Sequence, residues 1–344
     1  MRAIAYRQPG AIDRPDALID IDLPQPVATG RDLLIAVEAV SVNPVDAKVR
    51  GGAAPFDGRS ERILGWDAAG VVAAVGPDVT AFKVGDAVWY AGSLVRDGSN
   101  AEYQLVDERI VGRRPRRLTA AEAAALPLTA ITAWEVLFDR LRVSDGVAGG
   151  GAGTILIIGG AGGVGSIAIQ IARARTDLTV IATASRPETR QWVQDLGAHH
   201  VIDHARPLAP QIAALGIDAP AFVFSTTHTD RHLSDIAELI APQGRFALID
   251  DPAGLDIVAF KRKSVSVHWE LMFTRSLFET ADMAEQGRVL DTVAELVDAG
   301  AIRTTLTETM TPIDAASLIA AHRQIESATT RGKIVLAGWG ADAA

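Results

Sequence analysis

Between residues 154 and 270, short runs of apolar and β-branched residues alternate with stretches that have the apolar spacing of amphipathic helices. Nearly continuous apolar runs predict parallel strands buried on both faces, and the stretches between them predict crossover helices. The predicted strands are 154–158, 178–184, 200–203, 221–225, 245–250 and 264–269, and the predicted helices are 163–175, 187–196, 208–215 and 231–240. This alternation predicts an α/β fold with a doubly wound parallel sheet of the dinucleotide-binding type.

The first 110 residues have a different pattern, in which short strand-like segments lie between proline and glycine turn signals. Such spacing is typical of an antiparallel, barrel-like domain. The segments are 33–40, 69–75, 87–90 and 101–106. Residues 120–138 have a helical pattern interrupted at Pro127, and we expect them to link the two domains. After residue 270 the pattern predicts a helix at 281–299, a strand at 304–309, a helix at 313–325 and a strand at 333–336.

A cluster of glycines follows the first predicted parallel strand. Gly160, Gly162 and Gly165 satisfy the pattern G-x-G-x-x-G, and an amphipathic helix pattern begins directly afterwards. A strand–turn–helix of this kind presents backbone N–H groups and a helix N-terminus to a pyrophosphate. We therefore predict that a nucleotide binds at Gly160, Ala161, Gly162, Gly163, Val164 and Gly165. A second glycine run at 149–153 precedes the strand and predicts a flexible entry loop.

Composition narrows the class of protein. The chain has 344 residues, a length that predicts two domains. Its formal net charge of −9 argues against a nucleic-acid partner, and no apolar run predicts a membrane span. Cysteine is absent, which excludes disulfides, thiol catalysis and cysteine-ligated zinc. We predict a cytoplasmic enzyme that acts on a small molecule.

Six separated segments, taken in order, resemble the medium-chain dehydrogenase/reductase superfamily. They are SVNPVD at 41–46, LGWDAAGVV at 64–72, VGDAV at 84–88, AALPLT at 124–129, the glycine turn at 160–165 and RGKIVL at 331–336. The resemblance covers essentially the whole chain. It is greatest for the quinone oxidoreductase-like branch, which includes proteins named zinc-type alcohol dehydrogenase-like.

This resemblance implies a GroES-like β-barrel catalytic domain formed by residues 1–128 and 272–344. A Rossmann NADP-binding domain at residues 129–271 is inserted between the two parts. The resemblance also implies that the active site lies in the cleft between the two domains. Because members of this branch often pair through the last Rossmann strand, we expect a homodimer.

The zinc site of the superfamily does not match this sequence. Zinc-bearing relatives have a cysteine where this chain has Asn43, and Gly-His-Glu where it has Gly65, Trp66 and Asp67. Tryptophan cannot ligate zinc, and the amide of asparagine is a poor ligand for it. We therefore expect no zinc and no other bound metal.

The end of the second predicted parallel strand indicates which nicotinamide cofactor binds. A sheet that prefers NAD carries Asp or Glu there, which accepts a hydrogen bond from the ribose 2′-OH. This chain has Ser185 and Arg186, a hydroxyl and a guanidinium that suit a 2′-phosphate, so we predict NADPH. Alternatively, Ser185 and Glu188 form a capping box for the next helix, which leaves Arg186 unexplained. The family match implies further cofactor contacts at Pro127, Thr129, Thr132, His204 and Lys333.

Without zinc, hydrogen-bond donors must stabilise the charge that develops on a substrate oxygen. The family match places Asn43 and Lys48 on the segment that lines the cleft, with Asp67 beside it, and these three are our candidate catalytic residues. Asp67, and Asp46 in the same turn, can alternatively be structural, through turn hydrogen bonds. Lys48 can equally be a solvated surface charge.

Five further side chains are candidates for the substrate pocket: Trp66, Asn100, His268, Trp269 and Met272. The last three lie at and just after the end of the last predicted parallel strand, 264–269, where they could shape an apolar pocket over the nicotinamide. They can equally form a dimer interface or part of the core, and Asn100 can have a loop-structuring role.

These observations predict an oxidoreductase that transfers hydride from NADPH to quinones or α,β-unsaturated carbonyls without zinc. One alternative is a zinc-type carbonyl or alcohol oxidoreductase. A second alternative, from another functional class, is an NADPH-binding redox sensor with little turnover.

Overall fold

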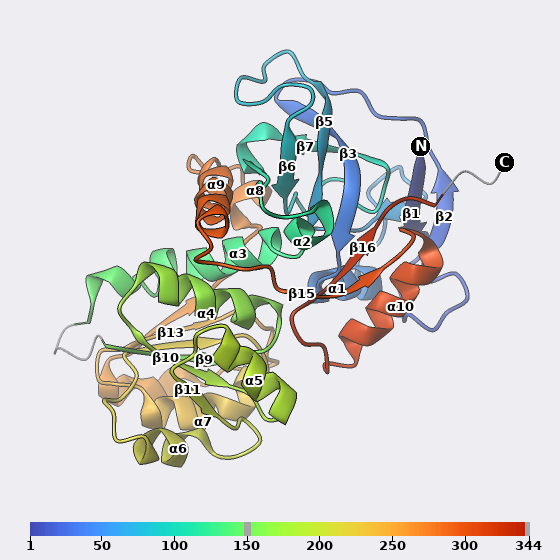
Figure 1. Ribbon diagram of the computed structural model, residues 1–344. Helices are drawn as coiled ribbons and strands as arrows, with labels where there is room; N and C mark the ends of the chain where they lie inside the picture. The colour runs from blue at the N-terminus through green and yellow to red at the C-terminus, as the bar shows by residue number, and fades with distance from the viewer. Residues whose placement is uncertain (148–152, 341–344) are drawn as a thin grey trace. The chain divides into compact units, whose positions relative to one another are not determined.

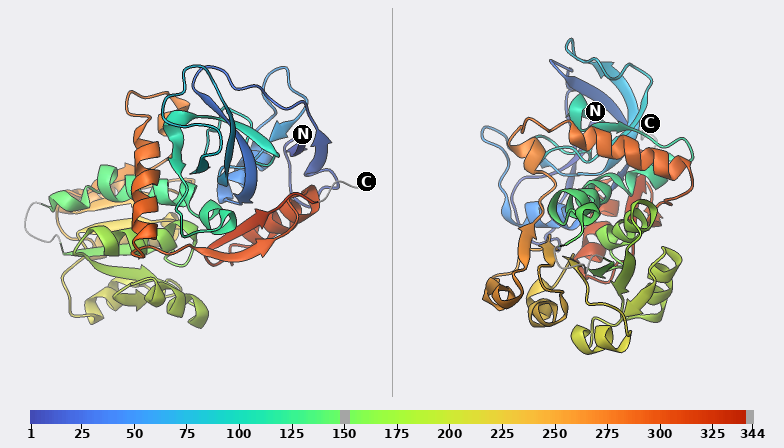
Figure 2. Two further views of the ribbon diagram at one scale, coloured as in Figure 1. Left: turned by 45° about the horizontal axis from the view of Figure 1, so that its top comes forward. Right: turned by 90° about the vertical axis from the view of Figure 1, so that its left-hand side faces the viewer.

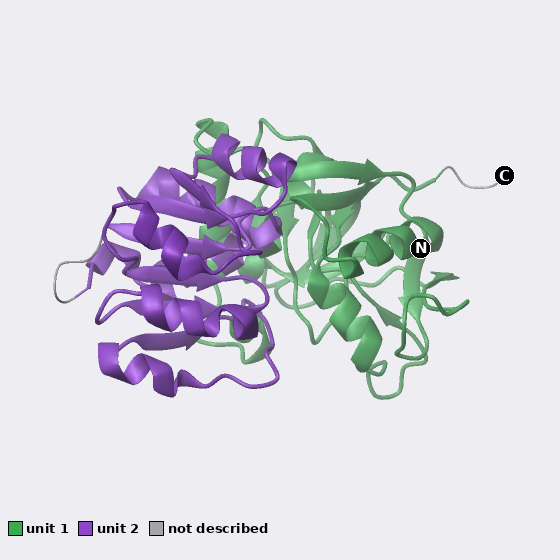
Figure 3. Ribbon diagram, turned by 90° about the horizontal axis from the view of Figure 1, so that it is seen from below, with its two compact units in different colours: residues 1–128, 273–344 green, residues 129–272 purple. Residues whose placement is uncertain are grey.

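The computed structural model describes residues 1–147 and 153–340. The chain divides into two compact units, which Figure 3 shows in different colours. Unit 1 consists of Met1–Leu128 and Phe273–Ala344, and unit 2 of Thr129–Met272. The expected return to the first domain, at residue 272, lies one residue earlier than the division in the structure. The entry loop expected at 149–153 lies, except for Gly153, outside the described residues.

Unit 2 contains a six-stranded sheet with the order β11-β10-β9-β12-β13-β14, in which every neighbouring pair is parallel. Its strands are β9 (Thr154–Ile158), β10 (Thr179–Thr183), β11 (His200–Ile202), β12 (Phe222–Ser225), β13 (Arg245–Leu248) and β14 (Ser266–Trp269). The predicted doubly wound sheet is confirmed, and each strand lies within its predicted range. The strand order reverses between β9 and β12, and this is the switch point at which such sheets bind ligands.

Helices cover both faces of this sheet. The chain moves from β9 to β11 in one direction and from β12 to β14 in the other, so right-handed crossovers set the two groups of helices on opposite faces. The first group is α4 (Gly163–Arg175) and α5 (Pro187–Asp195), and the second is α6 (Leu208–Ala214), α7 (Thr229–Leu239) and the 3₁₀ helix η4 (Ile257–Lys263) (Figure 1). Leu208, Ile236 and Phe260 of the second group pack with Leu156 and Val223 of the sheet in one apolar core.

Unit 1 is built around antiparallel strands. A seven-stranded sheet has the order β15-β16-β3-β5-β6-β8, with β7 paired to β3, and a three-stranded sheet has the order β2-β1-β4. The strands are β1 (Arg2–Tyr6), β2 (Ile19–Asp22), β3 (Asp32–Ser41), β4 (Arg62–Ile63), β5 (Ala68–Val75), β6 (Ala87–Tyr90), β7 (Tyr103–Asp107), β8 (Val111–Arg113), β15 (Leu306–Met310) and β16 (Lys333–Ala337). The expected antiparallel domain is confirmed, with one parallel pair, β15 and β16.

The C-terminal part of the chain packs closely on the N-terminal part within unit 1. The helices of this unit are α1 (Pro44–Gly52), η1 (Glu108–Ile110), α2 (Ala120–Ala124), α8 (Thr274–Leu277), α9 (Glu285–Asp298) and α10 (Ala315–Glu326). Helix α9, orange in Figure 2, packs against β8 so tightly that a Cβ on Gly112 would lie 2.4 Å from Cβ of Leu290. Glycine at 112 therefore permits the close approach of helix and strand.

The stretch Ala120–Asp145 is helical over most of its length, with a break before Pro127. It contains α2, α3 (Pro127–Trp134), the π-helix η2 (Glu135–Arg140) and the 3₁₀ helix η3 (Val143–Asp145). By length and composition this stretch could cross a membrane, but 78% of its most apolar window is buried inside the protein. It therefore has the burial expected of a core helix. The π-helix was not predicted, and such segments often occur at functional sites.

Candidate active-site residues and cofactor-binding turn

Three strands of unit 1 bring residues from distant parts of the sequence together. β16 pairs antiparallel with β3, with Val335 opposite Ser41, and continuing this register sets Lys333 opposite Asn43. β5 pairs with the other side of β3, where the N–H of Ser41 donates to the carbonyl of Asp67 at 3.0 Å. The sheet register therefore places Asn43, Asp67 and Lys333 beside one another.

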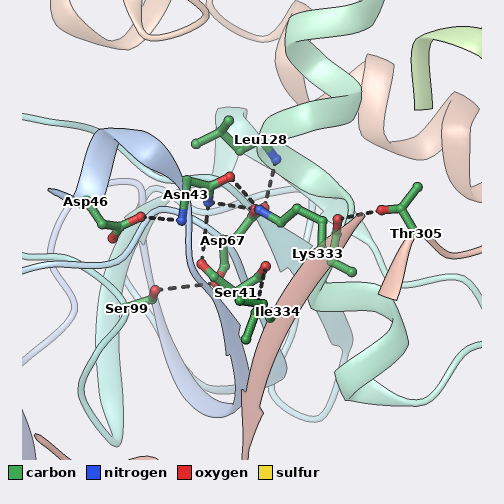
Figure 4. A network of polar contacts seen from close by, with 10 residues as sticks. Ser41, Asn43, Asp46, Asp67, Ser99, Leu128, Thr305, Lys333 and Ile334 are labelled. Carbon is green, nitrogen blue, oxygen red and sulfur yellow. Dashed lines mark hydrogen bonds and ion pairs between the residues drawn. The ribbon is translucent and has the colours of Figure 1, made fainter. Parts of the chain in front are cut away.

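The side chains of these three residues form one hydrogen-bonded network (Figure 4). Lys333 Nζ donates to Asn43 Oδ1 and to Asp67 Oδ2, the latter at 2.9 Å. Asn43 Nδ2 also donates to Asp67 Oδ2, at 2.9 Å, and the N–H of Leu128 donates to Asp67 Oδ1 at 2.8 Å. Asn43, Asp67 and Lys333 are 1%, 0% and 4% exposed. We call them the Asn43–Asp67–Lys333 network.

Burial raises the pKa of two carboxyls, Asp67 in the network and Asp46 beside it. Burial raises the pKa of Asp67, while the Lys333 charge and the hydrogen bonds from Leu128 and Asn43 act in the opposite direction. Burial also raises the pKa of Asp46, to about 7, although the N–H of Asn43 donates to it at 2.8 Å. Asp46 thereby caps the start of α1, which is the turn-holding role considered for it from the sequence.

The remaining predicted residues of unit 1 lie in different surroundings. Lys48 lies on the exposed side of α1, whereas Asn43 of the same segment is buried. Trp66 has no exposed surface: its Nε1 donates to the carbonyl of Ser93 at 3.0 Å, and its ring packs edge-on against Phe273. Asn100 is 2% exposed, and its backbone N–H donates to the carbonyl of Leu64 at 2.9 Å. Trp66 and Asn100 thus help to hold the core and a loop, and their predicted pocket roles stay predictions.

Sequence reasoning missed the pairing of Lys333 with Asp67. It placed Lys333 at the cofactor, and the structure places its ammonium in the network of unit 1. A signal was present, because Lys333 is the charged residue that begins an otherwise apolar strand, and buried charges are normally paired. Its partner depends on strand register, which local patterns do not encode. The contact of Lys333 with cofactor remains a prediction.

The donor atoms of the network do not suit a zinc ion. Asn43 Oδ1 and Asp67 Oδ2 both accept hydrogen bonds from an ammonium, and Trp66, at the expected histidine position, offers only an N–H donor. Zinc prefers thiolate, imidazole and carboxylate ligands in a tetrahedral arrangement. Within residues 1–147 and 153–340, no group of three or more His, Cys, Asp or Glu side chains could hold a metal ion.

In unit 2, the predicted phosphate-binding turn joins β9 to α4. Gly159 and Gly165 allow the turn to be tight: Gly159 has φ +79°, and a Cβ on Gly165 would lie 2.3 Å from the carbonyl oxygen of Gly159. A Cβ on Gly160 would lie 2.9 Å from Cβ of Ala182 on β10. A Cβ on Gly162 would meet nothing closer than 3.5 Å. The fold therefore requires glycine at 165 and 160, but leaves room beside Gly162 for a ligand.

The helix that follows this turn can bind an anion. α4 begins at Gly163, its N-cap is Gly162, and no side chain caps it. The first N–H groups of any helix have no acceptor within the helix, and the helix dipole adds positive potential at this end. Gly163, Val164 and Gly165 supply these N–H groups, so the turn fits the pyrophosphate of a dinucleotide.

The end of β10 lacks an acidic side chain, as the sequence predicted. Arg186 is 44% exposed at the side chain, and its Nε lies 3.1 Å from Glu188 Oε1. The alternative of a capping box between Ser185 and Glu188 is wrong in detail, because the N-cap of α5 is Arg186. Its N–H donates at 3.2 Å to Oγ1 of Thr189, so the box is formed one residue later.

A threonine at the end of β10 connects the glycine turn to a histidine. Thr183 Oγ1 accepts from the N–H of Gly159 at 3.0 Å and lies 3.2 Å from Nδ1 of His204. Burial lowers the pKa of His204, and the positive charge of Arg186 acts in the same direction. Thr183 therefore fixes the position of His204 beside the turn, a link that the sequence analysis did not predict.

One member of a buried carboxyl pair lies next in sequence to the residues predicted at the last strand of unit 2. Glu270 follows β14 and receives a hydrogen bond from Arg140 Nε at 2.7 Å. Burial and the neighbouring Glu135, which hydrogen-bonds to Glu270, raise the pKa of Glu270 to about 8. His268 is half-buried, which lowers its pKa, whereas Trp269 is 57% exposed. Three other predicted residues are buried: Thr129, Thr132 and Met272.

Comparison with known proteins places both units in one family. The chain matches the alcohol dehydrogenase GroES-like domain at residues 29–116 and the zinc-binding dehydrogenase family at residues 196–336. It is 39% identical over 337 residues to the zinc-type alcohol dehydrogenase-like protein SAS2087 of Staphylococcus aureus (strain MSSA476). That match covers 98% of this chain and 99% of the relative.

Solved structures agree with this assignment. A protein from Rhizobium etli CFN 42, described as a zinc-dependent alcohol dehydrogenase, has a TM-score of 0.97 and 62% identity over 99% of both chains. The quinone oxidoreductase from Coxiella burnetii has a TM-score of 0.78 and 25% identity over 98% of this chain and 99% of its own. The protein described here thus belongs to the medium-chain dehydrogenase/reductase superfamily, in its quinone oxidoreductase-like branch.

Proposed function

We propose that this oxidoreductase reduces quinones or α,β-unsaturated carbonyls with NADPH and without zinc. The observation that carries the choice of cofactor is the end of β10, where Ser185 and Arg186 stand in place of an acid. A carboxylate there would repel a 2′-phosphate, whereas an exposed guanidinium can bind it with two parallel hydrogen bonds. The mycobacterial protein Rv1454c, solved with NADPH, adds support: its TM-score is 0.80 and its identity 27%, over 98% of this chain and 100% of that one.

NADPH, when bound, supplies the hydride, and the residues of this chain bind and orient it. In this proposal the N–H groups of Gly163, Val164 and Gly165 hold the pyrophosphate, and Arg186 holds the 2′-phosphate. Gly162 allows the cofactor to approach the backbone. His204, fixed by Thr183, lies in the same region of unit 2 and is a further candidate contact.

The Asn43–Asp67–Lys333 network limits what Asn43 can do in this reaction. Its Nδ2 donates to Asp67 at 2.9 Å and lies 3.4 Å from the carbonyl of Ser41, so both amide hydrogens face an acceptor. We therefore assign Asn43 a positioning role, and not the direct contact with a substrate oxygen considered from the sequence. The group that donates to that oxygen is in this proposal a backbone N–H or Lys48.

The oxygen atoms of the Asn43–Asp67–Lys333 network also argue against a zinc-type carbonyl or alcohol oxidoreductase, the first alternative considered from the sequence. Reduction of an unactivated carbonyl needs a group that polarises the oxygen, and in the zinc-bearing relatives that group is the metal ion. The Asn43 and Asp67 oxygens are occupied by the Lys333 ammonium. An activated double bond needs less polarisation, which favours quinones and enones as substrates.

The decisive experiment measures steady-state rates with NADPH and with NADH against a panel of quinones, enones and aldehydes. We expect turnover of quinones or enones and a lower KM for NADPH than for NADH. Turnover of aldehydes alone would support the alcohol dehydrogenase alternative. Tight NADPH binding with no turnover of any substrate would support the redox-sensor alternative. A lower KM for NADH would refute the cofactor assignment.

We further propose that the protein is a homodimer. β14 is an edge strand of the six-stranded sheet, so one side of its backbone has no strand partner among the described residues. The side chains of Trp269 and Leu271, at the end of this strand, are 57% and 50% exposed. An edge strand with exposed apolar side chains is suited to pairing with a second copy of itself.

A further inference from the structure

Three histidines of unit 2 lie at the edge of the sheet that carries the proposed cofactor site. In a parallel sheet the carboxyl ends of all strands meet at this edge. His204 follows β11, His228 follows β12 as the N-cap of α7, and His232 lies one turn further along α7. Arg186, which we assign to the 2′-phosphate, follows β10 at the same edge. We call His204, His228 and His232 the histidine cluster.

Hydrogen bonds join the segments that carry two of these histidines. Nδ1 of His204 lies 3.2 Å from Oγ1 of Thr183 at the end of β10. Further along the same segment, the N–H of Leu208 donates to Oδ2 of Asp235 at 2.9 Å. Asp235 lies one turn after His232 on α7, so this bond ties the segment after β11 to the helix that carries His232. The fold thus brings the segments after β11 and β12 together, although these strands are not neighbours in the sheet.

The contact with Thr183 determines which nitrogen of His204 carries the hydrogen. Thr183 Oγ1 accepts from the N–H of Gly159 at 3.0 Å, which leaves its hydroxyl hydrogen for Nδ1 of His204. Neutral His204 then has its hydrogen on Nε2, and a charged ring keeps one there. Nε2 is therefore a hydrogen-bond donor in both states, which is what an anion requires of its ligand.

The three rings and Arg186 hinder one another's protonation. Burial lowers the pKa of His204, and the charges of His228 and Arg186 act in the same direction. Burial also lowers the pKa of His232, and the charges of His204 and His228 again add to the effect. A negatively charged ligand beside the cluster would act in the opposite direction, because an opposite charge favours the protonated ring.

Fixed charges of both signs surround the cluster. Asp203 acts on the pKa of His204, and Asp235 on that of His232, in the direction opposite to burial. The other charged side chains of the adjoining segments are Glu188 and Arg190 on α5, Asp230 and Arg231 on α7, and Asp250 after β13. Arginine and carboxylate charges generally change little between about pH 6 and pH 8, whereas those of histidines do change. The charge of this region in that range therefore depends on the histidines.

We propose that the histidine cluster is the second half of the 2′-phosphate site, and that binding of this phosphate draws protons onto the cluster from solution. The proposal rests on the preference for NADPH proposed above. A phosphate monoester carries a charge of about −1.5 to −2 near neutral pH, which favours charged rings beside it. A ligand whose binding takes up protons binds more tightly as pH falls. The cluster and Arg186 thus together set the choice between the two nicotinamide cofactors, and the choice becomes stricter in mild acid.

The test compares NADP⁺ with NAD⁺, which differ only in the 2′-phosphate. Isothermal titration calorimetry at about pH 7, in buffers of different ionisation enthalpy, counts the protons taken up on binding. We expect uptake with NADP⁺ and almost none with NAD⁺. The affinity for NADP⁺ relative to NAD⁺ should fall by about threefold between about pH 7 and pH 8, the change that half a proton produces.

The double variant His228→Asn/His232→Gln tests the cluster directly. Asparagine suits position 228 because it tolerates the left-handed backbone there, where φ is +51°. This variant should take up fewer protons with NADP⁺ and lose most of the pH dependence. His200→Gln, at the opposite end of β11 from His204, is the matched control and should behave as wild type. Since both proteins bind the same ligand at the same pH, the titration of the phosphate itself cancels in the comparison.

Unchanged NAD⁺ binding shows that a variant keeps a folded site, and the single variant His228→Asn, at an exposed position, replaces the double variant if that does not fold. Equal proton uptake with NADP⁺ by wild type and variant would overturn the role of the cluster, even if NADP⁺ binds more tightly than NAD⁺. Equal affinity for NADP⁺ and NAD⁺ at every pH would instead refute the cofactor assignment, and this proposal with it.

Discussion

The guanidinium of Arg140 lies 2.7 Å from the buried carboxyl of Glu270, which itself shares a hydrogen bond with the buried Glu135. Two carboxyls can hydrogen-bond to each other only if one of them carries a proton. A singly protonated pair has one negative charge, which Arg140 balances. Loss of that proton would leave two buried carboxylates beside one guanidinium.

This arrangement predicts a pH-dependent stability. The pKa of Glu270 rises from 4.5 to about 8 in the folded protein, so the folded state holds a proton that the unfolded state releases. The free energy of unfolding should therefore fall as pH rises from about 4.5 to about 8. Glu270→Gln, which mimics the protonated form, should lose this contribution and be more stable than wild type at pH 9, by an amount on the order of a few kcal/mol.

Urea denaturation at several pH values measures this difference. Glu295→Gln, on the exposed side of α9, is the control and should follow the wild-type profile. A Glu270→Gln variant that is less stable than wild type at pH 9 would contradict a shared proton.

Alanine substitutions at two glycines of the turn should affect protein stability and cofactor affinity separately. Gly165→Ala would place a Cβ 2.3 Å from the carbonyl oxygen of Gly159, so we expect a lower Tm and a cost of about 1–3 kcal/mol or more. Gly162→Ala meets nothing closer than 3.5 Å, so its Tm should stay near wild type. Its affinity for NADPH should nevertheless fall, because the added methyl occupies space that the cofactor uses. Thermal denaturation and cofactor fluorescence titration report the two effects. Wild-type NADPH affinity in Gly162→Ala would refute an approach of the cofactor at this point.

Replacing Arg186 should alter cofactor preference. Arg186→Ala should weaken NADPH binding by about 1.5–3 kcal/mol, the usual range for hydrogen bonds to a charged group, and leave NADH binding almost unchanged. Dissociation constants for both cofactors test this. Arg206→Ala, whose side chain is 77% exposed after β11, serves as the matched control. Equal weakening of both cofactors would show that Arg186 acts through α5 and not through the 2′-phosphate.

The proposed dimer predicts that one charge on the edge of β14 separates the subunits. Leu271→Asp adds a carboxylate at a half-exposed apolar position and should convert the dimer to monomers in sedimentation velocity. Val27→Asp, at a 78% exposed apolar position in unit 1, should leave the dimer intact. Wild-type protein that sediments as a monomer at micromolar concentration would refute the dimer itself.

The sequence predicted the parallel sheet well because each buried strand is itself a continuous apolar run, so the signal is local. The glycine turn was predictable for the same reason, since strand, turn and helix are consecutive. Helix α5 begins at Pro187, as predicted, but its capping box lies one residue later than the alternative box of Ser185 and Glu188, because Ser185 and Thr189 both resemble capping residues. Only the backbone path after β10 decides between them.

The Asn43–Asp67–Lys333 network could not be predicted from local patterns. Asn43 and Lys333 are separated by 290 positions, and they meet through the register between β3 and β16. The same holds for Thr183 and His204, which depend on the pairing of β10 with β11. Motifs identified Asn43 and Asp67 as candidates, but the charge that holds them came from the last strand of the fold.

The discontinuity of unit 1 has a consequence for the order of events during synthesis. Residues 129–272 are contiguous, so unit 2 can fold as soon as it has left the ribosome, whereas unit 1 must wait for β16. Until residue 333 emerges, the carboxylate of Asp67 has no lysine to balance its charge, so burying it costs free energy. Pairing of β16 completes the barrel and at the same time brings the Lys333 ammonium to Asp67. A chain that ends before residue 333 would therefore leave this domain incompletely folded and accessible to quality-control proteases.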